Sequence, residues 1–144
     1  MAVCTFFGHR DTPKKIEPIL KSTLIDLIEN KKVDLFYIGN QGNFDYMVRK
    51  KLKELKHIYK NISYIIVLAY MPTENNKINN EDNYETLFPL GLENTPPKFA
   101  INKRNKWMID NSDYVITYVK YAVGGAALFK SLAEKKGKKV INIE

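Results

Sequence analysis

The hydrophobic residues of this chain fall into short continuous runs separated by longer segments with helical spacing. Short apolar runs bounded by turn residues are typical of buried strands. The continuous runs occupy residues 2–7, 33–38, 62–70, 113–119 and 138–143. Apolar positions with the spacing of one helix face occupy residues 16–28, 44–59, 99–112 and 124–137. The pattern therefore predicts five strands that alternate with four helices.

This alternation implies βαβ units, whose right-handed crossovers build a parallel sheet. The run at 62–70 is almost continuously apolar, as in a strand covered on both faces. We therefore expect an α/β fold: a Rossmann-like doubly wound sheet of about five mainly parallel strands with helices on both faces. The expected strand order is 3-2-1-4-5. With 144 residues and no internal repeat, the chain is expected to form a single domain, 1–144.

Residues 71–98 interrupt this regularity. The segment is polar and rich in Asn, with Pro and Gly scattered through it, and it is too long for an ordinary connection. A lid over a binding site and a plain surface excursion both fit this pattern. We expect a long loop with a helical turn near residues 84–88.

Composition narrows the functional classes. The single cysteine, Cys4, lies in an apolar run, which excludes an intrachain disulfide and a multi-cysteine zinc site and favours a buried thiol. No apolar run is long enough to span a membrane, and the first residues lack the features of a signal peptide. We therefore expect a cytoplasmic protein with no membrane partner.

The chain is basic, with a formal charge of +7 and a pI of about 9.4. This charge favours an anionic partner, and a nucleotide, a nucleic acid or an acidic protein surface would each satisfy it. Many lysines fall in helical segments such as RKKLKEL, where a solvated helix face explains them without any ligand. Charge alone does not choose among these partners.

Glycines and polar residues cluster directly after three of the predicted strands. Ligands of parallel sheets bind outside the carboxyl ends of the strands, near the point where strand order reverses. Glycine lets the backbone approach a ligand, and the free N–H groups of a helix start attract anions. The candidate ligand-binding residues in these turns are Gly8, His9, Arg10, Gly39, Asn40, Gly42, Asp45, Tyr121, Gly124 and Gly125.

None of these turns is specific by itself. The stretch GNQG matches neither a Walker A loop nor the G-x-G-x-x-G dinucleotide fingerprint. Arg10 offers a bidentate fork for a phosphate or carboxylate. It is the convergence of three turns on one sheet edge that indicates a ligand site.

Asp45 and His9 each have two interpretations. Asp45 falls near the first turn of a helix, where the helix dipole stabilises a carboxylate without a ligand. As a site residue it would accept hydrogen bonds from ribose hydroxyls, or act as a base or nucleophile. His9 would either contact the ligand or only hydrogen-bond a loop.

The helix predicted at 99–112 adds three candidates. Ile101 and Met108 share its apolar side, which leaves Arg104 and Asn105 near the edge of that side. Trp107 is expected to anchor the core, with stacking on a base as the alternative.

Four segments carry a family resemblance over nearly the whole chain outside 71–98. They are FFGHRD, IGNQGNFDYMV, KRNKWMIDNSDYVITYV and GGAALFKSLAEKKGKKVINI. Together they resemble the SLOG superfamily of Rossmann-like nucleotide-associated domains, most closely its YpsA-like branch. The resemblance implies a pocket for a nucleotide or a nucleotide-derived molecule, formed by Gly8, His9, Arg10, Gly39, Gly42, Asp45, Arg104, Asn105, Gly124 and Gly125.

Related domains sense nucleotide signals, form the DNA-binding module of DprA, or act as LOG-type phosphoribohydrolases. LOG enzymes carry a Pro-Gly-Gly-x-Gly-Thr-x-x-Glu loop whose Glu takes part in glycosidic cleavage. The corresponding stretch here, AVGGAALFK, has both glycines but no acid. This departure favours binding over hydrolysis.

We therefore expect binding or sensing of a nucleotide-like anion, such as an ADP-ribose-type or cyclic nucleotide signal. Arg10 and the turn amides would hold phosphate, Asp45 and Asn105 the ribose, and an aromatic side chain such as Trp107 or Tyr121 the base.

Two other functions stay open. An N-glycosidase or nucleoside transferase would use Asp45 with His9 as an auxiliary group, because oxocarbenium-like cleavage needs a carboxylate close to the sugar. A DNA-binding module is the third interpretation. No metal site and no cofactor are expected, and a homodimer or larger homo-oligomer is expected because SLOG relatives often pair through helices.

Overall fold

The computed structural model describes residues 2–71 and 84–144. The sheet has six strands, and every strand pair is parallel. The strands are β1 (Ala2–Gly8), β2 (Val33–Ile38), β3 (Ser63–Val67), β4 (Thr86–Leu87), β5 (Tyr114–Tyr118) and β6 (Lys139–Asn142). The helices are α1 (Glu17–Asn30), α2 (Gly42–Lys56), α3 (Pro97–Asp110) and α4 (Gly125–Lys135), with 3-10 turns η1 (Lys14–Ile16) and η3 (Leu92–Asn94).

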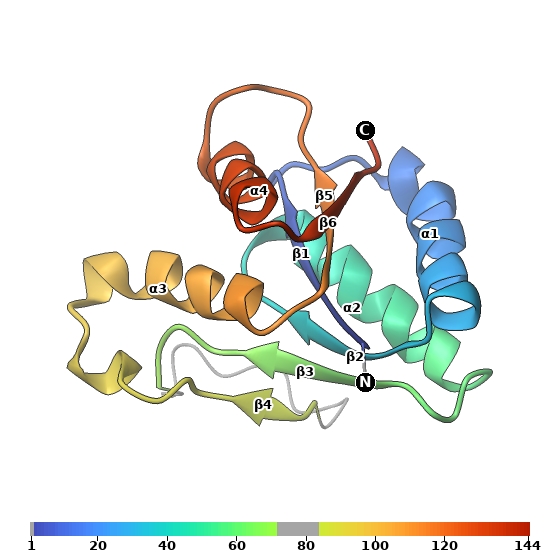
Figure 1. Cartoon of the computed structure of the whole chain (residues 1–144), viewed down its shortest axis with the longest axis horizontal. Coiled ribbons are helices and arrows are strands. Elements are labelled where there is room, and N and C mark those ends of the chain that lie inside the picture. Colours follow the sequence, from blue (N-terminus) through green and yellow to red (C-terminus); the bar gives the residue numbers. More distant parts are fainter. Residues whose placement is uncertain (1, 72–83) are drawn as a thin grey trace.

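The Rossmann-like doubly wound α/β fold is confirmed. The sheet order is β4-β3-β2-β1-β5-β6, so the five predicted strands, which are β1, β2, β3, β5 and β6, lie in the predicted spatial order. Figure 1 shows α1 and α2 on one side of the sheet and α3 and α4 on the other. After β1 the chain continues to β2 and β3, on the side of the sheet that ends in β4. After β5 it continues to β6, at the opposite end, so strand order reverses between β1 and β5.

The prediction of a helical turn near residues 84–88 is wrong. Here β4 pairs in parallel with the end of β3. The N–H of Ile66 donates to the carbonyl of Glu85 (2.9 Å), and the N–H of Leu68 donates to the carbonyl of Leu87 (2.8 Å). This sixth strand satisfies backbone groups of β3 that would otherwise lack partners. Of the expected loop or lid at 71–98, residues 72–83 lie outside the described residues, and the described remainder contains β4, η3 and the start of α3.

Each face of the sheet has its own hydrophobic core. Successive residues of a strand point to opposite faces, and in β1 Phe6 packs with one core while Phe7 packs with the other. The first core includes Leu20, Leu24, Phe44 and Val48 of α1 and α2. The second includes Met108, Ile109, Phe129 and Ala133 of α3 and α4.

Cys4 is fully buried in the first core, as its apolar surroundings predict. Burial raises the pKa of its thiol well above the usual value.

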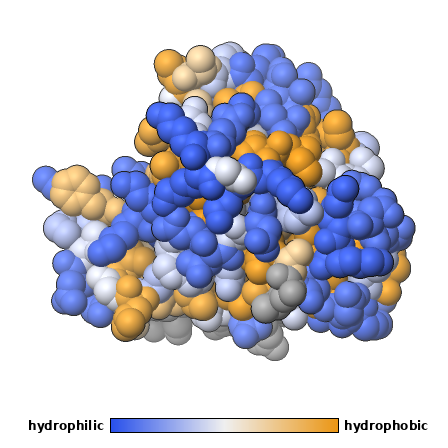
Figure 2. Space-filling view, viewed as in Figure 1, coloured by the Kyte–Doolittle hydropathy of each residue, from blue (hydrophilic) through white to orange (hydrophobic). Residues whose placement is uncertain are grey.

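Hydrophilic residues cover most of the face seen in Figure 2, with smaller hydrophobic areas between them. Within residues 2–71 and 84–144, no helix has both the length and the apolar composition that a membrane crossing requires.

Candidate functional site

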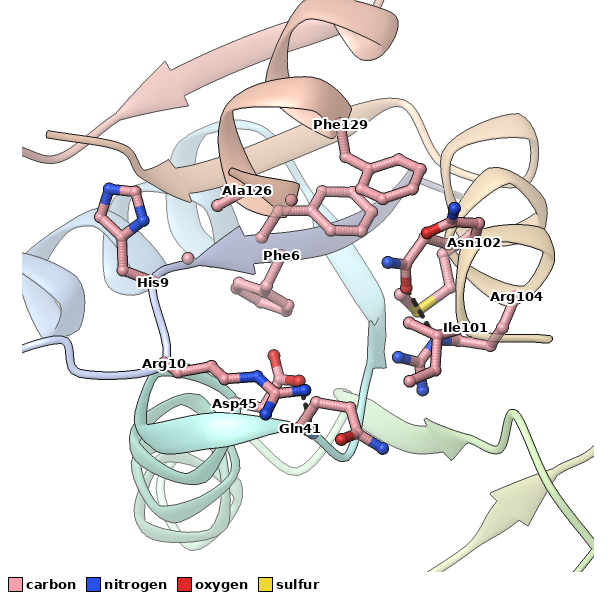
Figure 3. Close-up of a pocket in the computed structure, with 15 residues that line it drawn as sticks. Phe6, His9, Arg10, Gln41, Asp45, Ile101, Asn102, Arg104, Ala126 and Phe129 are labelled. Carbon is pink, nitrogen blue, oxygen red and sulfur yellow. Dashed lines mark hydrogen bonds between the residues drawn. The ribbon is translucent and has the colours of Figure 1, made fainter. Parts of the chain in front are cut away.

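A cavity of about 270 Å³ opens at the carboxyl edge of the sheet, beside the end of β1. Its walls are the turn after β1, the starts of α2 and α4, and one side of α3 (Figure 3). The expected site residues that line it are Gly8, His9, Arg10, Asp45, Arg104, Asn105 and Gly125. The cavity therefore combines all three glycine turns with the predicted helix, as expected for one site.

The turns after β1 and β2 pack tightly against each other. The N–H of Asn43 donates to the carbonyl of Arg10 (2.9 Å). Gly42 has a φ of +84°, and a Cβ there would lie 2.9 Å from the Cα of Arg10. A side chain at position 42 would therefore be strained and would collide with the neighbouring turn. This contact holds the Arg10 backbone while its exposed guanidinium extends beside Gln41 and Asp45 (Figure 3).

Asp45 caps the start of α2 and also faces the cavity. Its Oδ2 accepts a hydrogen bond from the backbone N–H of Gln41 (2.9 Å). Burial raises the pKa of the carboxyl from 3.8 to about 6, and the Gln41 N–H and the charges of Arg104 and Arg49 oppose that shift. Asp45 therefore has a structural role at the start of α2, and its position at the cavity leaves a role in ligand binding as a prediction.

Arg104 is a buried cation, with only 2% of its surface exposed. Its Nε donates to Oδ1 of Asn105 (2.8 Å), and its Nη1 donates to the carbonyl of Val67 at the end of β3 (3.0 Å). Burial lowers the pKa of Arg104, and the charge of Asp45 opposes that change. Two donors of Arg104 are thus occupied inside the protein: the bond to Val67 anchors the guanidinium, and the Nε–H holds the side chain of Asn105.

Gly39 makes room for this arrangement. A Cβ at position 39 would lie 2.8 Å from Oδ2 of Asp45 and 3.3 Å from Nη2 of Arg104. Gly39 therefore lies behind the two charged groups rather than on the cavity wall. Its role is to admit them, since any larger residue would push them apart.

Asn105 presents a hydrogen-bond donor to the cavity. The residue is 8% exposed, and its Oδ1 is occupied by Arg104. Its amide NH2 has no hydrogen-bond partner among the described residues, although Asn105 lines the cavity. The NH2 is open to the cavity rather than sealed in the interior, so it is available as a donor to a ligand.

His9 holds the loop after β5. Its Nε2 accepts hydrogen bonds from the backbone N–H groups of Lys120 (2.9 Å) and Tyr121 (3.4 Å). Its ring meets Tyr118 edge-on, with centroids 5.9 Å apart. Accepting at Nε2 requires the neutral ring with its proton on Nδ1. The loop-binding interpretation of His9 therefore applies, and the same ring also lines the cavity.

The remaining expected residues lie outside the cavity. Tyr121 is 57% exposed and lines a neighbouring groove. Asn40 accepts a hydrogen bond from Arg49 (3.4 Å). Gly124, with a φ of +105°, precedes α4, and a Cβ there would meet open space. Trp107 packs edge-on against Tyr37 with the second core, which confirms it as a core anchor.

The apolar wall of the cavity is the part that sequence reasoning missed. It comprises Ile101 and Met108 of α3 and Phe129 of α4, together with Phe7 of β1. The helical spacing of Ile101 and Met108 identified an apolar face, but the same face both packs on the sheet and borders the cavity. Gln41, in the turn after β2, also lines the cavity, although it was not among the candidate ligand-binding residues.

In the described part of the chain, no group of three or more His, Cys, Asp or Glu side chains is arranged to hold a metal ion.

No protein-family model matches the chain, and no curated protein matches it. Among solved structures, the chain is similar to the X-ray structure of DNA processing protein A (DprA) from Streptococcus pneumoniae. The fold is DprA-like.

The TM-score of this match is 0.66, at 15% sequence identity. The match covers 97% of this chain and 49% of the DprA chain, so this chain spans about half the length of that protein. At this identity the similarity establishes the shared Rossmann-like architecture. Function has to be inferred from the cavity.

Proposed function

We propose that this chain binds a nucleotide or a nucleotide-derived anion in the cavity beside β1. The observation that carries the proposal is the side chain of Asn105 at the cavity: Arg104 holds its Oδ1, and its NH2 has no partner among the described residues. It shares the cavity with the carboxylate of Asp45. A fixed donor and a fixed acceptor together suit the two hydroxyls of a ribose, each of which both donates and accepts.

Three other parts of the cavity wall support the same ligand class. Arg10 is exposed at the cavity, and its guanidinium can form a bidentate contact with a phosphate. The start of α4 at Gly125 borders the cavity, and its unpaired N–H groups favour an anion. Ile101, Met108 and Phe129 offer an apolar surface for a base. We further propose that the chain belongs to the YpsA-like branch of the SLOG superfamily, from the motifs described above.

Calorimetric titration with a panel of nucleotides tests the proposal. The panel contains nucleoside mono- and diphosphates, cyclic nucleotides and ADP-ribose. We expect at least one to bind with a Kd in the micromolar range or tighter, because a fixed polar pair and an apolar wall are already in place. Folded protein that binds none of them would refute the proposal.

A matched pair of variants ties the binding to Asn105. In Asn105→Asp the new carboxylate still accepts the Arg104 Nε–H, but the NH2 donor is gone. We expect the affinity to fall about tenfold or more, as for loss of a buried hydrogen bond to the ligand. Asn61→Asp makes the same chemical change at an exposed position before β3 and should leave the affinity unchanged.

An N-glycosidase is a second candidate, favoured by the raised pKa of Asp45, which is about 6. A carboxyl that titrates near neutral pH suits acid–base work. However, Asp45 is the one carboxylate among the described residues that line the cavity, whereas glycoside hydrolysis generally uses two. Incubation with nucleotides should release free base if this activity exists. Unchanged release by Asp45→Asn would remove Asp45 from the mechanism.

DNA binding is a third candidate, favoured by the formal charge of +7 and by the similarity to a protein named for DNA processing. Binding dominated by phosphate contacts weakens steeply as salt rises. A gel-shift series over increasing salt measures this slope. Absence of a shift at low salt would count against this function.

A further inference from the structure

A second, polar groove adjoins the cavity at the point where strand order reverses. It has a volume of about 310 Å³ and lies between the loop after β1 and the end of β5. Lys15 and Asp11 border it on the β1 side, and Lys120 and Tyr121 border it on the β5 side. In doubly wound sheets this crevice between strands that lead to opposite edges is the general ligand position.

His9 joins the groove to the cavity. It is the residue that lines both spaces. Because its Nε2 accepts the N–H groups of Lys120 and Tyr121, it fixes the loop that forms the far side of the groove. A ligand held by Arg10 in the cavity can therefore continue past the His9 ring into a groove whose walls are already placed.

The groove carries a positive charge. It has two ammonium groups, from Lys15 and Lys120, against one carboxylate, from Asp11. Among the described residues, neither lysine forms an ion pair. The ring of Tyr121 lies next to them, 57% exposed and 5.9 Å from Nζ of Lys120. Exposed cations beside an open ring suit an anionic group, and they also suit a flat group attached to it.

The size of the cavity indicates what the groove would hold. Ligand pockets commonly have volumes of roughly 300–1,000 Å³, and the cavity alone, at about 270 Å³, lies just below that range. A ligand longer than a nucleoside monophosphate needs further space. The groove is the adjoining space, and it has the charge that a second phosphate requires.

We propose that the groove at Lys15 and Lys120 is the subsite for the second phosphate of the ligand, so that this chain selects nucleotides that carry a diphosphate. This inference rests on the proposed nucleotide binding in the cavity. The diphosphate can be terminal, as in a nucleoside diphosphate, or bridge to a second group, as in a nucleoside diphosphate sugar. In the second case the added group lies against the ring of Tyr121.

The test compares matched mono- and diphosphates of adenosine, guanosine, cytidine and uridine by calorimetry. For the nucleoside that binds, the wild type should hold the diphosphate about tenfold more tightly than the monophosphate. The double variant Lys15→Ala/Lys120→Ala should lose this advantage and keep the affinity for the monophosphate within about twofold, because the backbone N–H of Lys120 still bonds His9.

A control variant removes the same charge elsewhere. Lys31 and Lys60 are exposed and precede β2 and β3. They therefore lie at the amino ends of the strands, on the opposite side of the sheet from the groove at the carboxyl ends. Lys31→Ala/Lys60→Ala should retain the preference for the diphosphate. The variant Tyr121→Ala, titrated with ADP and with ADP-ribose, separates the two ligand types. Loss of affinity for ADP-ribose alone assigns the bridged diphosphate, and equal affinities in variant and wild type assign the terminal one.

Three results would overturn the inference. Equal affinity of the wild type for mono- and diphosphates would remove the groove while leaving nucleotide binding in place. Equal weakening of both ligands in the Lys15→Ala/Lys120→Ala variant would show general charge attraction instead of a subsite. Absence of binding by every nucleotide, with folded protein, would remove the proposed function and the subsite together.

Discussion

Asp45 is predicted to destabilise the folded protein at neutral pH, although the same residue is proposed to take part in binding. Burial raises the pKa of its carboxyl from 3.8 to about 6, against the attraction of Arg104 and Arg49. The folded protein therefore holds a proton on Asp45 at pH values where the unfolded chain has lost it. Stability from this group is fully present below about pH 4 and falls as the pH rises to about 6.

The size of the effect follows from the same shift. Each pKa unit corresponds to about 1.4 kcal/mol, so ionised Asp45 costs the folded protein about 2–3 kcal/mol at pH 7. Asp45→Asn removes this cost and keeps an oxygen that accepts the Gln41 N–H. We expect the variant to be more stable than the wild type by about 2–3 kcal/mol at pH 7. The loss of attraction to Arg104 is already contained in this figure, because the pKa reflects both effects.

Urea unfolding of both proteins at steps from pH 4 to pH 8 measures the difference. The two free energies of unfolding should nearly coincide at pH 4 and diverge up to about pH 6, since only the wild type titrates there. Nucleotide affinity should fall in the same variant, as expected when a polar site is kept at the expense of stability. A variant that is less stable than the wild type at pH 7, or a difference that does not depend on pH, would refute the reasoning.

Two further predictions concern the turns around the cavity. A Cβ at Gly8 would lie 2.3 Å from the ring of Phe44, so Gly8→Ala should lower the free energy of unfolding by about 1–3 kcal/mol. Gly125→Ala is the control: a Cβ there would meet open space, so this variant should have little effect in the same denaturation assay. His9→Phe removes the acceptor for two loop amides, and amide hydrogen exchange at Lys120 and Tyr121 should accelerate about two- to tenfold. Unchanged exchange there would mean that His9 does not hold the loop.

Much of the fold is local in origin and could be predicted from the sequence. The apolar run of β1 and the helical spacing of α1 are each set by the solvent exposure of nearby residues. Alternation of such elements leaves few topologies, which explains why the strand order was predicted correctly. The same topology brings the turns containing Gly8, Gly42 and Gly125 together at the carboxyl ends of the strands, so the sequence also predicted where these turns meet.

Other features depend on contacts between distant segments. Strand β4 exists because a short segment meets the open edge of β3, and nothing in its own residues reveals that partner. Arg104 and Asn105 were expected as ligand-binding neighbours, but burial against Val67 turns Arg104 inward and makes it the group that orients Asn105. Tyr121 was expected in the same pocket and instead borders the adjoining groove.

Hydrophobic periodicity and chain chirality act over short distances, so the amino-acid sequence was enough to predict the four helices, every strand except β4, the order in which those strands pair and the end of the sheet at which polar groups gather. The tertiary structure decided which of those groups are buried, which are already paired and which stay available to a ligand. Burial, the pKa of Asp45 and the free amide of Asn105 depend on the summed surroundings of each atom, and those surroundings come from segments far apart in the chain.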